Sequence, residues 1–313
     1  MATGDLEYSV DKEIAQFFDK TTATRAACDA YAAEHLGGDV IPVAVQDGDC
    51  KSCSNHIYSH FAPNVAFKGH IGDDMEGKEP VYIYVMDRIH GISYLDFILA
   101  HNSRISENSG TFSSWRRILL TDIARFFALP WNAPQTVTHP YRDGLHHQYE
   151  KELGLLLTSL PPRFCRFIQE SLDSLLVILS LPMVLLHKDF GVCNIMVNET
   201  SFNLTGVIDW AEAEIAPFGL NLHSLQRFIS KFHLERGWIR YNDYFILEEI
   251  FWTTFRNEAG ELDDETIRVV KLARGMGLLL SCGFTSRLAN EPVPAPIQDD
   301  ENGAYNMLVW MGY

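Results

Sequence analysis

The amino-acid sequence predicts an α+β fold with two parts, a small N-terminal part that contains strands and a large C-terminal part that is mostly helical. Three observations lead to this prediction. The run Val-Tyr-Ile-Tyr-Val-Met at 81–86 is the clearest strand of the first third of the chain. Beyond it, apolar residues recur mainly at helical spacing. Two short apolar runs that end at Leu186 and Ile208 interrupt the helices in the second half.

The N-terminal part is predicted to begin with helices and to continue with strands. Apolar residues at helical spacing predict two helices, and the pair Gly37-Gly38 would end the second one. The first predicted strand contains Pro42 and is therefore expected at a sheet edge, since proline cannot donate a hydrogen bond to a neighbouring strand. The predicted helices cover 10–20 and 24–35, and the predicted strands cover 40–46, 64–69 and 81–86.

The C-terminal part is predicted to contain seven helices. The clearest has one apolar face formed by Trp115, Ile118, Leu119, Ile123, Phe126 and Phe127. Asp263 or Asp264 would cap the last helix. The predicted helices cover 94–101, 112–129, 142–157, 163–179, 222–233, 243–256 and 264–280.

The most informative segment lies between the helices and carries polar residues at the ends of apolar runs. It reads His187-Lys-Asp189-Phe-Gly-Val-Cys-Asn194, and fifteen residues later a second apolar run ends in Asp209-Trp210. Two such runs indicate a hairpin whose polar residues lie at one end. These are the isolated carboxylate of Asp189 and the pair formed by Asn194 and Asp209. Phosphoryl transfer from a nucleotide needs such a set, because a carboxylate orients the attacking hydroxyl and oxygen ligands hold Mg²⁺.

The spacing of these residues alone is weak evidence. A His-x-Asp-x4-Asn pattern would occur by chance in roughly a few per cent of chains of this length. The context is more specific, because an ordinary hairpin turn gives no reason for a second strand-plus-carboxylate soon afterwards. The segment is therefore predicted to form a catalytic loop.

The segment from Val184 to Phe218 resembles the catalytic core of the aminoglycoside phosphotransferase and choline kinase-like family, and its sequence is most similar to fungal members. The resemblance implies a protein kinase-like two-lobe fold and ATP- and Mg²⁺-dependent transfer of phosphate to a hydroxyl of a small molecule. Asp189 would then be the catalytic base. Asn194 and Asp209 would be the metal ligands, and His187 would be a buried residue that holds the loop.

The resemblance also implies a hinge directly after the strand at 81–86. Backbone groups near Met86 and Arg88 would face the adenine of the nucleotide. The N-terminal nucleotide-lid lobe would cover 1–86 and the catalytic lobe 87–289. The proline- and acid-rich stretch 290–313 is predicted to be a loose tail.

The N-terminal lobe departs from the family pattern. Relatives cover the phosphates with a glycine-rich turn and hold them with a strand lysine paired to a helix glutamate. The stretch 45–60 contains Gly48 and Lys51, but it has no alternating strand and no glutamate upstream of Ile57. The lobe is therefore predicted to be incomplete. The alternative function is a catalytically impaired, pseudokinase-like homologue that clamps ATP poorly.

Charge and composition limit the classes of partner. The 313 residues include 47% hydrophobic ones, which excludes a disordered chain and allows two lobes. The net charge of −16, without a basic run, argues against nucleic acid. The acidic surface would suit a cationic substrate, although charge that only maintains solubility explains the same composition. No apolar run is long enough for a membrane span, and a cytoplasmic protein is expected.

A second, unrelated hypothesis concerns the cysteines. Cys50, Cys53, His56 and His60 form a Cys-x2-Cys-x2-His-x3-His pattern whose ligand types suit tetrahedral zinc. The short spacing and the apolar Ile57-Tyr58 within it favour a helix instead. The remaining cysteines are scattered, which indicates reduced thiols.

Overall fold

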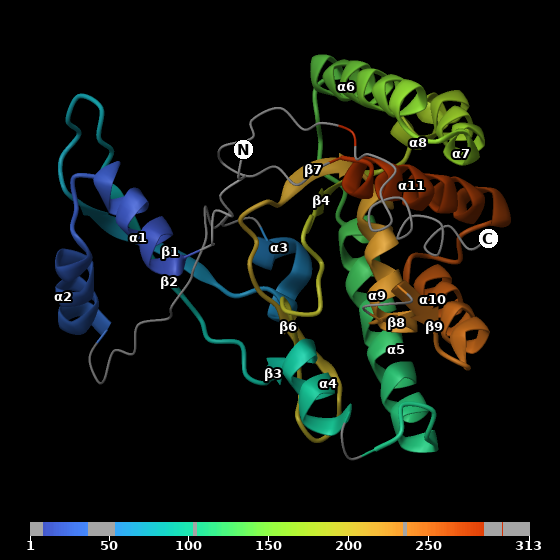
Figure 1. The fold of residues 1–313 in the computed structure, drawn as a ribbon, viewed down its shortest axis with the longest axis horizontal. Coiled ribbons are helices and arrows are strands. Elements are labelled where there is room, and N and C mark those ends of the chain that lie inside the picture. Colours follow the sequence, from blue (N-terminus) through green and yellow to red (C-terminus); the bar gives the residue numbers. More distant parts are fainter. Residues whose placement is uncertain (1–8, 37–53, 103–104, 234–236, 285–295, 297–313) are drawn as a thin grey trace, which may run out of the picture. The chain divides into compact units, whose positions relative to one another are not determined.

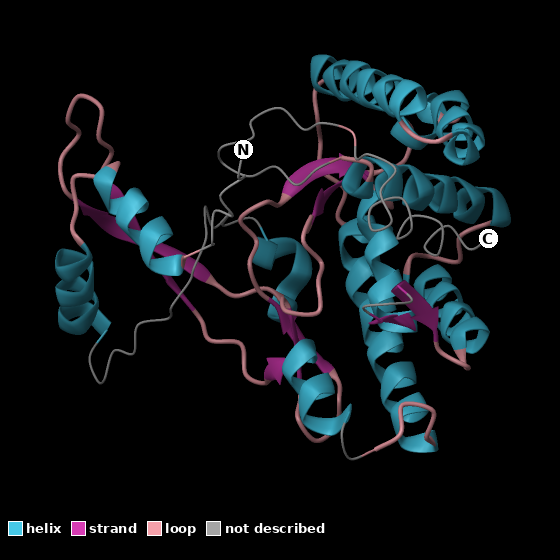
Figure 2. Cartoon of the chain, viewed as in Figure 1, coloured by secondary structure: helices cyan, strands magenta, loops and turns pink. Residues whose placement is uncertain are grey.

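The computed structural model describes residues 9–36, 54–102, 105–233, 237–284 and 296. The chain divides into two compact units, and its course is interleaved between them. Unit 1 comprises 1–52 and 64–88, whereas unit 2 comprises 53–63 and 89–313. Figures 1 and 2 show the helices and strands of each unit. None of the described helices combines the length and apolar content needed to cross a bilayer.

Unit 1 contains two helices and one antiparallel strand pair, as the sequence predicted for its described residues. These elements are α1 (Val10–Asp19), α2 (Arg25–Leu36), β1 (Val65–Ile71) and β2 (Val81–Met86). Side chains alternate along β2, so that Tyr82 and Tyr84 lie exposed beside Phe67 of β1. The base of this hairpin is closed because Asn64 Nδ2 donates to Asp87 Oδ2 at 2.6 Å.

Several predictions lie wholly or partly outside the described residues. They are the helix stop at Gly37-Gly38, the strand at 40–46, the stretch 45–60 in which the lobe is predicted to be incomplete, the cysteines Cys50 and Cys53 of the zinc pattern, and the tail 290–313, of which only Pro296 is described. Within the part of the chain that the structure describes, no three His, Cys, Asp or Glu side chains form a cluster that could hold a metal ion.

Unit 2 is mostly helical, with short antiparallel strand pairs between its helices. Strand β5 pairs with β3 and β6, β4 pairs with β7, and β8 pairs with β9. The helices are α3 (Ser54–Tyr58), η1 (Ser59–Phe61), α4 (Tyr94–Asn102), α5 (Gly110–Asn132), α6 (His139–Ser159), α7 (Pro162–Asp173), α8 (Leu175–Leu179), η2 (Leu220–Leu225), α9 (Gln226–Ile229), α10 (Tyr244–Glu258) and α11 (Asp264–Cys282). The strands are β3 (Ile92–Ser93), β4 (Met183–Leu186), β5 (Ile195–Val197), β6 (Leu204–Val207), β7 (Glu214–Pro217), β8 (Ser230–His233) and β9 (Gly237–Arg240).

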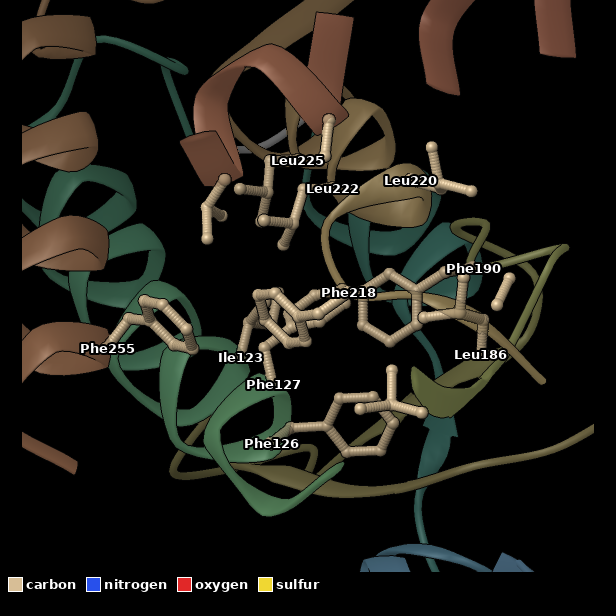
Figure 3. Packing of buried hydrophobic residues seen from close by; sticks show 14 of the residues in the cluster. Ile123, Phe126, Phe127, Leu186, Phe190, Phe218, Leu220, Leu222, Leu225 and Phe255 are labelled. Carbon is tan, nitrogen blue, oxygen red and sulfur yellow. The ribbon is translucent and has the colours of Figure 1, made fainter. Parts of the chain in front are cut away.

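Helix α5 forms the centre of the core of unit 2. It covers the predicted helix and begins earlier, where Ser109 accepts a hydrogen bond from the backbone N–H of Phe112 at 3.2 Å. Its buried face carries Phe126 and Phe127, and both rings contact Phe190 (Figure 3). Phe190 directly follows Asp189, so the loop that carries the predicted base is anchored in the hydrophobic core.

Two predicted helices are wrong in detail. The helix at 163–179 is broken at Ser174 into α7 and α8. The helix at 222–233 is replaced by η2, α9 and β8. Ser230 ends α9 because its backbone is extended (φ −150°, ψ 171°) and its hydroxyl donates to the carbonyl of Gln226 at 2.6 Å. That carbonyl would otherwise accept the next N–H of a helix, and the chain continues as a strand.

The other helices of unit 2 agree with the sequence prediction. Helices α4, α6, α10 and α11 match the predicted ranges to within a few residues at each end. The predicted cap is Asp263, whose carboxylate accepts from the backbone N–H of Thr266 at 2.7 Å.

The buried His223 of η2 makes folding stability dependent on pH. Burial lowers its pKa to about 4, although its Nδ1–H donates to the carbonyl of Leu220, which opposes the shift. The unfolded chain binds this proton as pH falls through 6.5, whereas the folded ring binds it only near pH 4. Stability is therefore fully present above pH 6.5 and falls as the pH is lowered from 6.5 to 4, by about 3 kcal/mol for this group.

Urea unfolding of the parent and of His223→Gln between pH 7 and pH 4.5 measures this contribution. Glutamine cannot take up the proton, so the difference in unfolding free energy between the two proteins should narrow by about 2 to 3 kcal/mol across this range. Parallel pH profiles for the two proteins would show that His223 is not the group responsible.

Candidate functional site

The strands of unit 2 bring the polar residues of the motif to one place. Strand β5 begins directly after Asn194 and pairs with β6 through Ile195 and Val207. The pairing is extended because the N–H of Ile208 donates to the carbonyl of Asn194 at 2.9 Å. Asn194 and Asp209 consequently lie at the same end of this hairpin. The other apolar run, β4, takes no part in the hairpin and pairs with β7 instead.

His187 ties the loop to the second strand. The ring is buried, and its Nε2–H donates to the carbonyl of Ile208 at 2.8 Å. It also packs edge-on against Trp210, with ring centroids 4.8 Å apart. Burial lowers the pKa of His187, although the bond to Ile208 and the nearby carboxylates oppose the shift. A neutral ring with this contact fits the structural role expected from the sequence.

Asp189 lies at the start of the loop and is held from two sides. Its Oδ2 accepts a hydrogen bond of 2.9 Å from Nδ2 of Asn194, and its backbone carbonyl accepts a second one of 3.0 Å from the same group. Its Oδ1 lies 3.8 Å from Nη1 of Arg227. The side chain of Asp189 is 58% exposed, which leaves the carboxylate accessible to a ligand.

Asn194 is buried, and its two contacts fix the orientation of its amide. Because Nδ2 donates to Asp189, the carbonyl oxygen Oδ1 is the atom left to accept or to coordinate. Amide and carboxylate oxygens are the ligands that Mg²⁺ prefers. The side-chain types of Asn194 and Asp209 therefore fit a site for Mg²⁺.

Asp209 has a backbone conformation that is rare for a residue with a side chain. Its φ is 61°, in the left-handed region, and its side chain is exposed. This conformation costs about 1 kcal/mol, and Asp tolerates it better than most residues. Strained backbone of this kind is common at functional sites. The strain at Asp209 occurs at the position that the sequence assigns to a metal ligand.

The loop is further supported by residues from distant elements. Asn221 Nδ2 donates to the carbonyl of His187 at 3.3 Å, and both residues are buried. The hydroxyl of Tyr58 donates to the carbonyl of Leu185 at 2.5 Å. The Tyr58 ring also contacts Trp210 at 4.6 Å. Helix α3 thereby braces the strand that leads into the loop.

Not all predicted site residues lie in this unit. Met86 is the last residue of β2, and Arg88 follows two positions later, both in unit 1 and both exposed. The structure brings together Asp189, Asn194 and Asp209 within unit 2.

The sequence did not predict that Arg227, Asn221 and Tyr58 belong to the site. Each is more than thirty residues from its partner in the loop or in β4 and has no characteristic spacing to it. Arg227 also falls within the segment predicted as one continuous helix. The sequence signal for Asn221 was its position as a polar residue between Leu220 and Leu222.

Comparisons with known proteins identify the family and the fold class of this chain. Residues 56–232 match the model of the phosphotransferase enzyme family. A putative aminoglycoside phosphotransferase from Ralstonia eutropha is similar over 92% of this chain and 97% of its own, with 12% identity and a TM-score of 0.51. This similarity confirms the predicted α+β, kinase-like fold class.

Two further solved structures have lower TM-scores. The GDP complex of aminoglycoside 2'-phosphotransferase-IIIa covers 71% of this chain and 67% of its own, with 16% identity and a TM-score of 0.42. An aminoglycoside phosphotransferase from Streptomyces rimosus, in complex with ADP and streptomycin, covers 72% and 79%, with 15% identity and a TM-score of 0.40. A search of curated proteins finds no match.

Proposed function

Because this chain belongs to the phosphotransferase enzyme family, we propose that it transfers the terminal phosphoryl group of ATP, bound with Mg²⁺, to a hydroxyl of a small molecule. The observation that carries the proposal is the convergence of Asp189, Asn194 and Asp209. One carboxylate is held in place and accessible, and the other two residues present oxygen atoms at one end of the β5–β6 hairpin.

Asp189 is the proposed catalytic base. It orients the acceptor hydroxyl and takes its proton as the new O–P bond forms and the bond between the terminal phosphorus and the ADP oxygen breaks. The hydrogen bond from Asn194 holds the carboxylate in one orientation before the acceptor arrives. A group fixed in this way loses little entropy in the reacting complex.

Asn194 and Asp209 are the proposed holders of Mg²⁺. The ion supplies positive charge that offsets the negative charge on the phosphate oxygens during transfer. The two residues come from the loop and from the segment after β6, so the hairpin pairing sets their separation. The backbone at Met86 and Arg88 is proposed to contact the adenine, as the resemblance implies.

The acceptor is proposed to be a cationic small molecule. The net charge of −16 favours attraction of a cation over an anion. Glu212, three residues after Asp209, is exposed and adds a carboxylate to this segment. An amine or a quaternary ammonium group on the acceptor would suit these charges.

A second candidate function is that of a homologue that binds ATP poorly and turns over slowly. The family match begins at residue 56, after the stretch in which the glycine turn, strand lysine and helix glutamate are missing from the sequence. Loss of the phosphate clamp would lower nucleotide affinity while leaving the loop at Asp189 intact.

Thermal unfolding in the presence of nucleotide tests both candidates. Mg²⁺-ATP at one hundred times its dissociation constant should stabilise the protein by about 2.7 kcal/mol, and ATP with EDTA should not. Stabilisation by Mg²⁺-ATP, together with ATP-dependent phosphorylation of an amine-bearing acceptor, supports the proposed enzymatic function. No stabilisation at millimolar Mg²⁺-ATP would contradict the proposed nucleotide dependence.

A further inference from the structure

We propose that Arg227 is a positioning residue for the catalytic base, Asp189. The guanidinium of Arg227 holds one carboxylate oxygen of Asp189, and Asn194 holds the other. This inference rests on the proposed function, because it assigns Arg227 to the same reaction. It concerns a residue outside the His-x-Asp-x4-Asn motif, 38 positions after Asp189 in the sequence.

The contacts at Asp189 are divided between its two oxygens. Oδ2 accepts from Asn194 Nδ2 at 2.9 Å, whereas Oδ1 lies 3.8 Å from Arg227 Nη1. The same Nη1 donates to the carbonyl of Phe190 at 3.3 Å, so the guanidinium also holds the next peptide of the loop. With a partner at each oxygen, rotation of the carboxylate about its Cβ–Cγ bond is restrained.

The backbone of Arg227 is fixed by its two neighbours in α9. Phe228 is fully buried and its ring lies 5.7 Å from that of Phe190. Gln226 is also buried, and its Nε2 donates to the hydroxyl of Ser230 at 3.0 Å. The Arg227 side chain is 28% exposed, so it reaches the loop from a rigid base along a partly buried path.

Gly191 provides the space in which the guanidinium approaches the carboxylate. A Cβ atom at this position would lie 3.1 Å from Arg227 Nη1 and 3.3 Å from Asp189 Oδ1. Both distances are tighter than usual contacts, so a side chain at 191 would displace at least one of the two charged groups by a few tenths of an ångström. The absence of a side chain at position 191 therefore accommodates the close approach of Arg227 to Asp189.

Folding stability does not explain this arrangement. An ion pair of 3.8 Å with a carboxylate that is more than half exposed contributes little to stability. The ion pair instead restrains the orientation of the Asp189 carboxylate. This restraint matters because displacement of a reacting group by about 1 Å can cost roughly 10²-fold in rate. Arginine suits this task better than lysine, because both contacts come from Nη1, whose hydrogens are fixed in the plane of the guanidinium, whereas a lysine ammonium rotates freely.

The first test is a mutant cycle on the rate of Mg²⁺-ATP hydrolysis, with water as the acceptor. Arg227→Met should lower kcat by about 10- to 10²-fold and leave the KM for ATP within about twofold, because the nucleotide does not contact Arg227 in this proposal. Arg227→Lys should recover part of the rate. In an Asp189→Asn background, Arg227→Met should have almost no further effect.

The second test needs no activity and measures hydrogen exchange of the backbone amides at 189–193. Arg227→Met and Gly191→Ala should both raise the exchange rate of this loop. Arg268→Met is the matched control, because this arginine pairs with Glu265 on its own helix, and it should leave the loop unchanged. Unfolding temperatures of all variants confirm that they are folded.

The outcomes separate this inference from the proposed function. Multiplicative effects of Arg227→Met and Asp189→Asn on kcat, or unchanged exchange of the loop in both Arg227→Met and Gly191→Ala, would overturn the role of Arg227. A parent protein that neither binds nor hydrolyses Mg²⁺-ATP would overturn the proposed function, and the exchange measurement would still decide whether Arg227 holds the loop. If Arg227→Met fails to fold, Arg227→Lys and Gly191→Ala carry both measurements.

Discussion

Replacement of Asp189 by asparagine is expected to lower the turnover number of phosphoryl transfer by about 10²- to 10⁴-fold, while ATP affinity stays nearly constant. The amide has the shape of the carboxylate and its oxygen can still accept the hydrogen bond from Asn194, so the loop should keep its structure. It is neutral and cannot accept a proton from the acceptor hydroxyl. The loss therefore falls on the chemical step.

Steady-state kinetics with Mg²⁺-ATP, combined with a thermal shift, measures this effect. The control is Asp173→Asn on α7, because Asp173 is also exposed and accepts a hydrogen bond from an amide, that of Gln169, at 2.8 Å. The control should retain full turnover. An Asp189→Asn protein with unchanged turnover would remove Asp189 from the mechanism.

Loss of the Asp209 carboxylate is expected to abolish the Mg²⁺-dependent part of nucleotide binding. At one hundred times the dissociation constant of the parent, that binding stabilises the protein by about 2.7 kcal/mol, and the variant should show almost none of it. The fold should survive, because the Asp209 side chain is exposed.

Two substitutions at this position separate the carboxylate from the backbone strain. Asp209→Ala and Asp209→Gly both remove the metal ligand, but only glycine adopts a φ of 61° without cost. The glycine variant should be more stable than the alanine variant by about 1 kcal/mol in urea unfolding, and neither should respond to Mg²⁺-ATP. A full Mg²⁺-ATP response in either variant would contradict the role of Asp209.

The features that the sequence predicts well depend on neighbours along the chain. Helix α11 is an example, because its apolar spacing and the cap at Asp263 are both local. The clustering of Asp189, Asn194 and Asp209 was also predictable, because one short hairpin brings the last two together and the loop places the first beside them. In both cases the interacting residues are separated by at most about twenty positions.

The features that could not be predicted depend on tertiary packing. The segment after Gly219 has helical spacing, but its residues up to Ser230 are all buried except Arg227, and Ser230 closes α9 after a single turn. Burial on all sides removes the amphipathic pattern that would distinguish a helix from a turn. Arg227 and Asn221 join the site only because this segment packs against the loop.

The bond between Tyr58 and Leu185 has a consequence for the order in which the protein folds during synthesis. Its two residues are 127 positions apart, although they belong to the same compact unit. At ribosomal rates of roughly 5 to 20 residues per second, the Tyr58 ring leaves the ribosome about 6 to 25 s before its partner. During this interval the apolar face of α3 has no β4 strand or Trp210 to cover it. The nascent chain therefore passes through a period in which the Tyr58 ring can pack against Phe126 of α5 but not against β4, and the site at Asp189 can become rigid only after β4 has emerged.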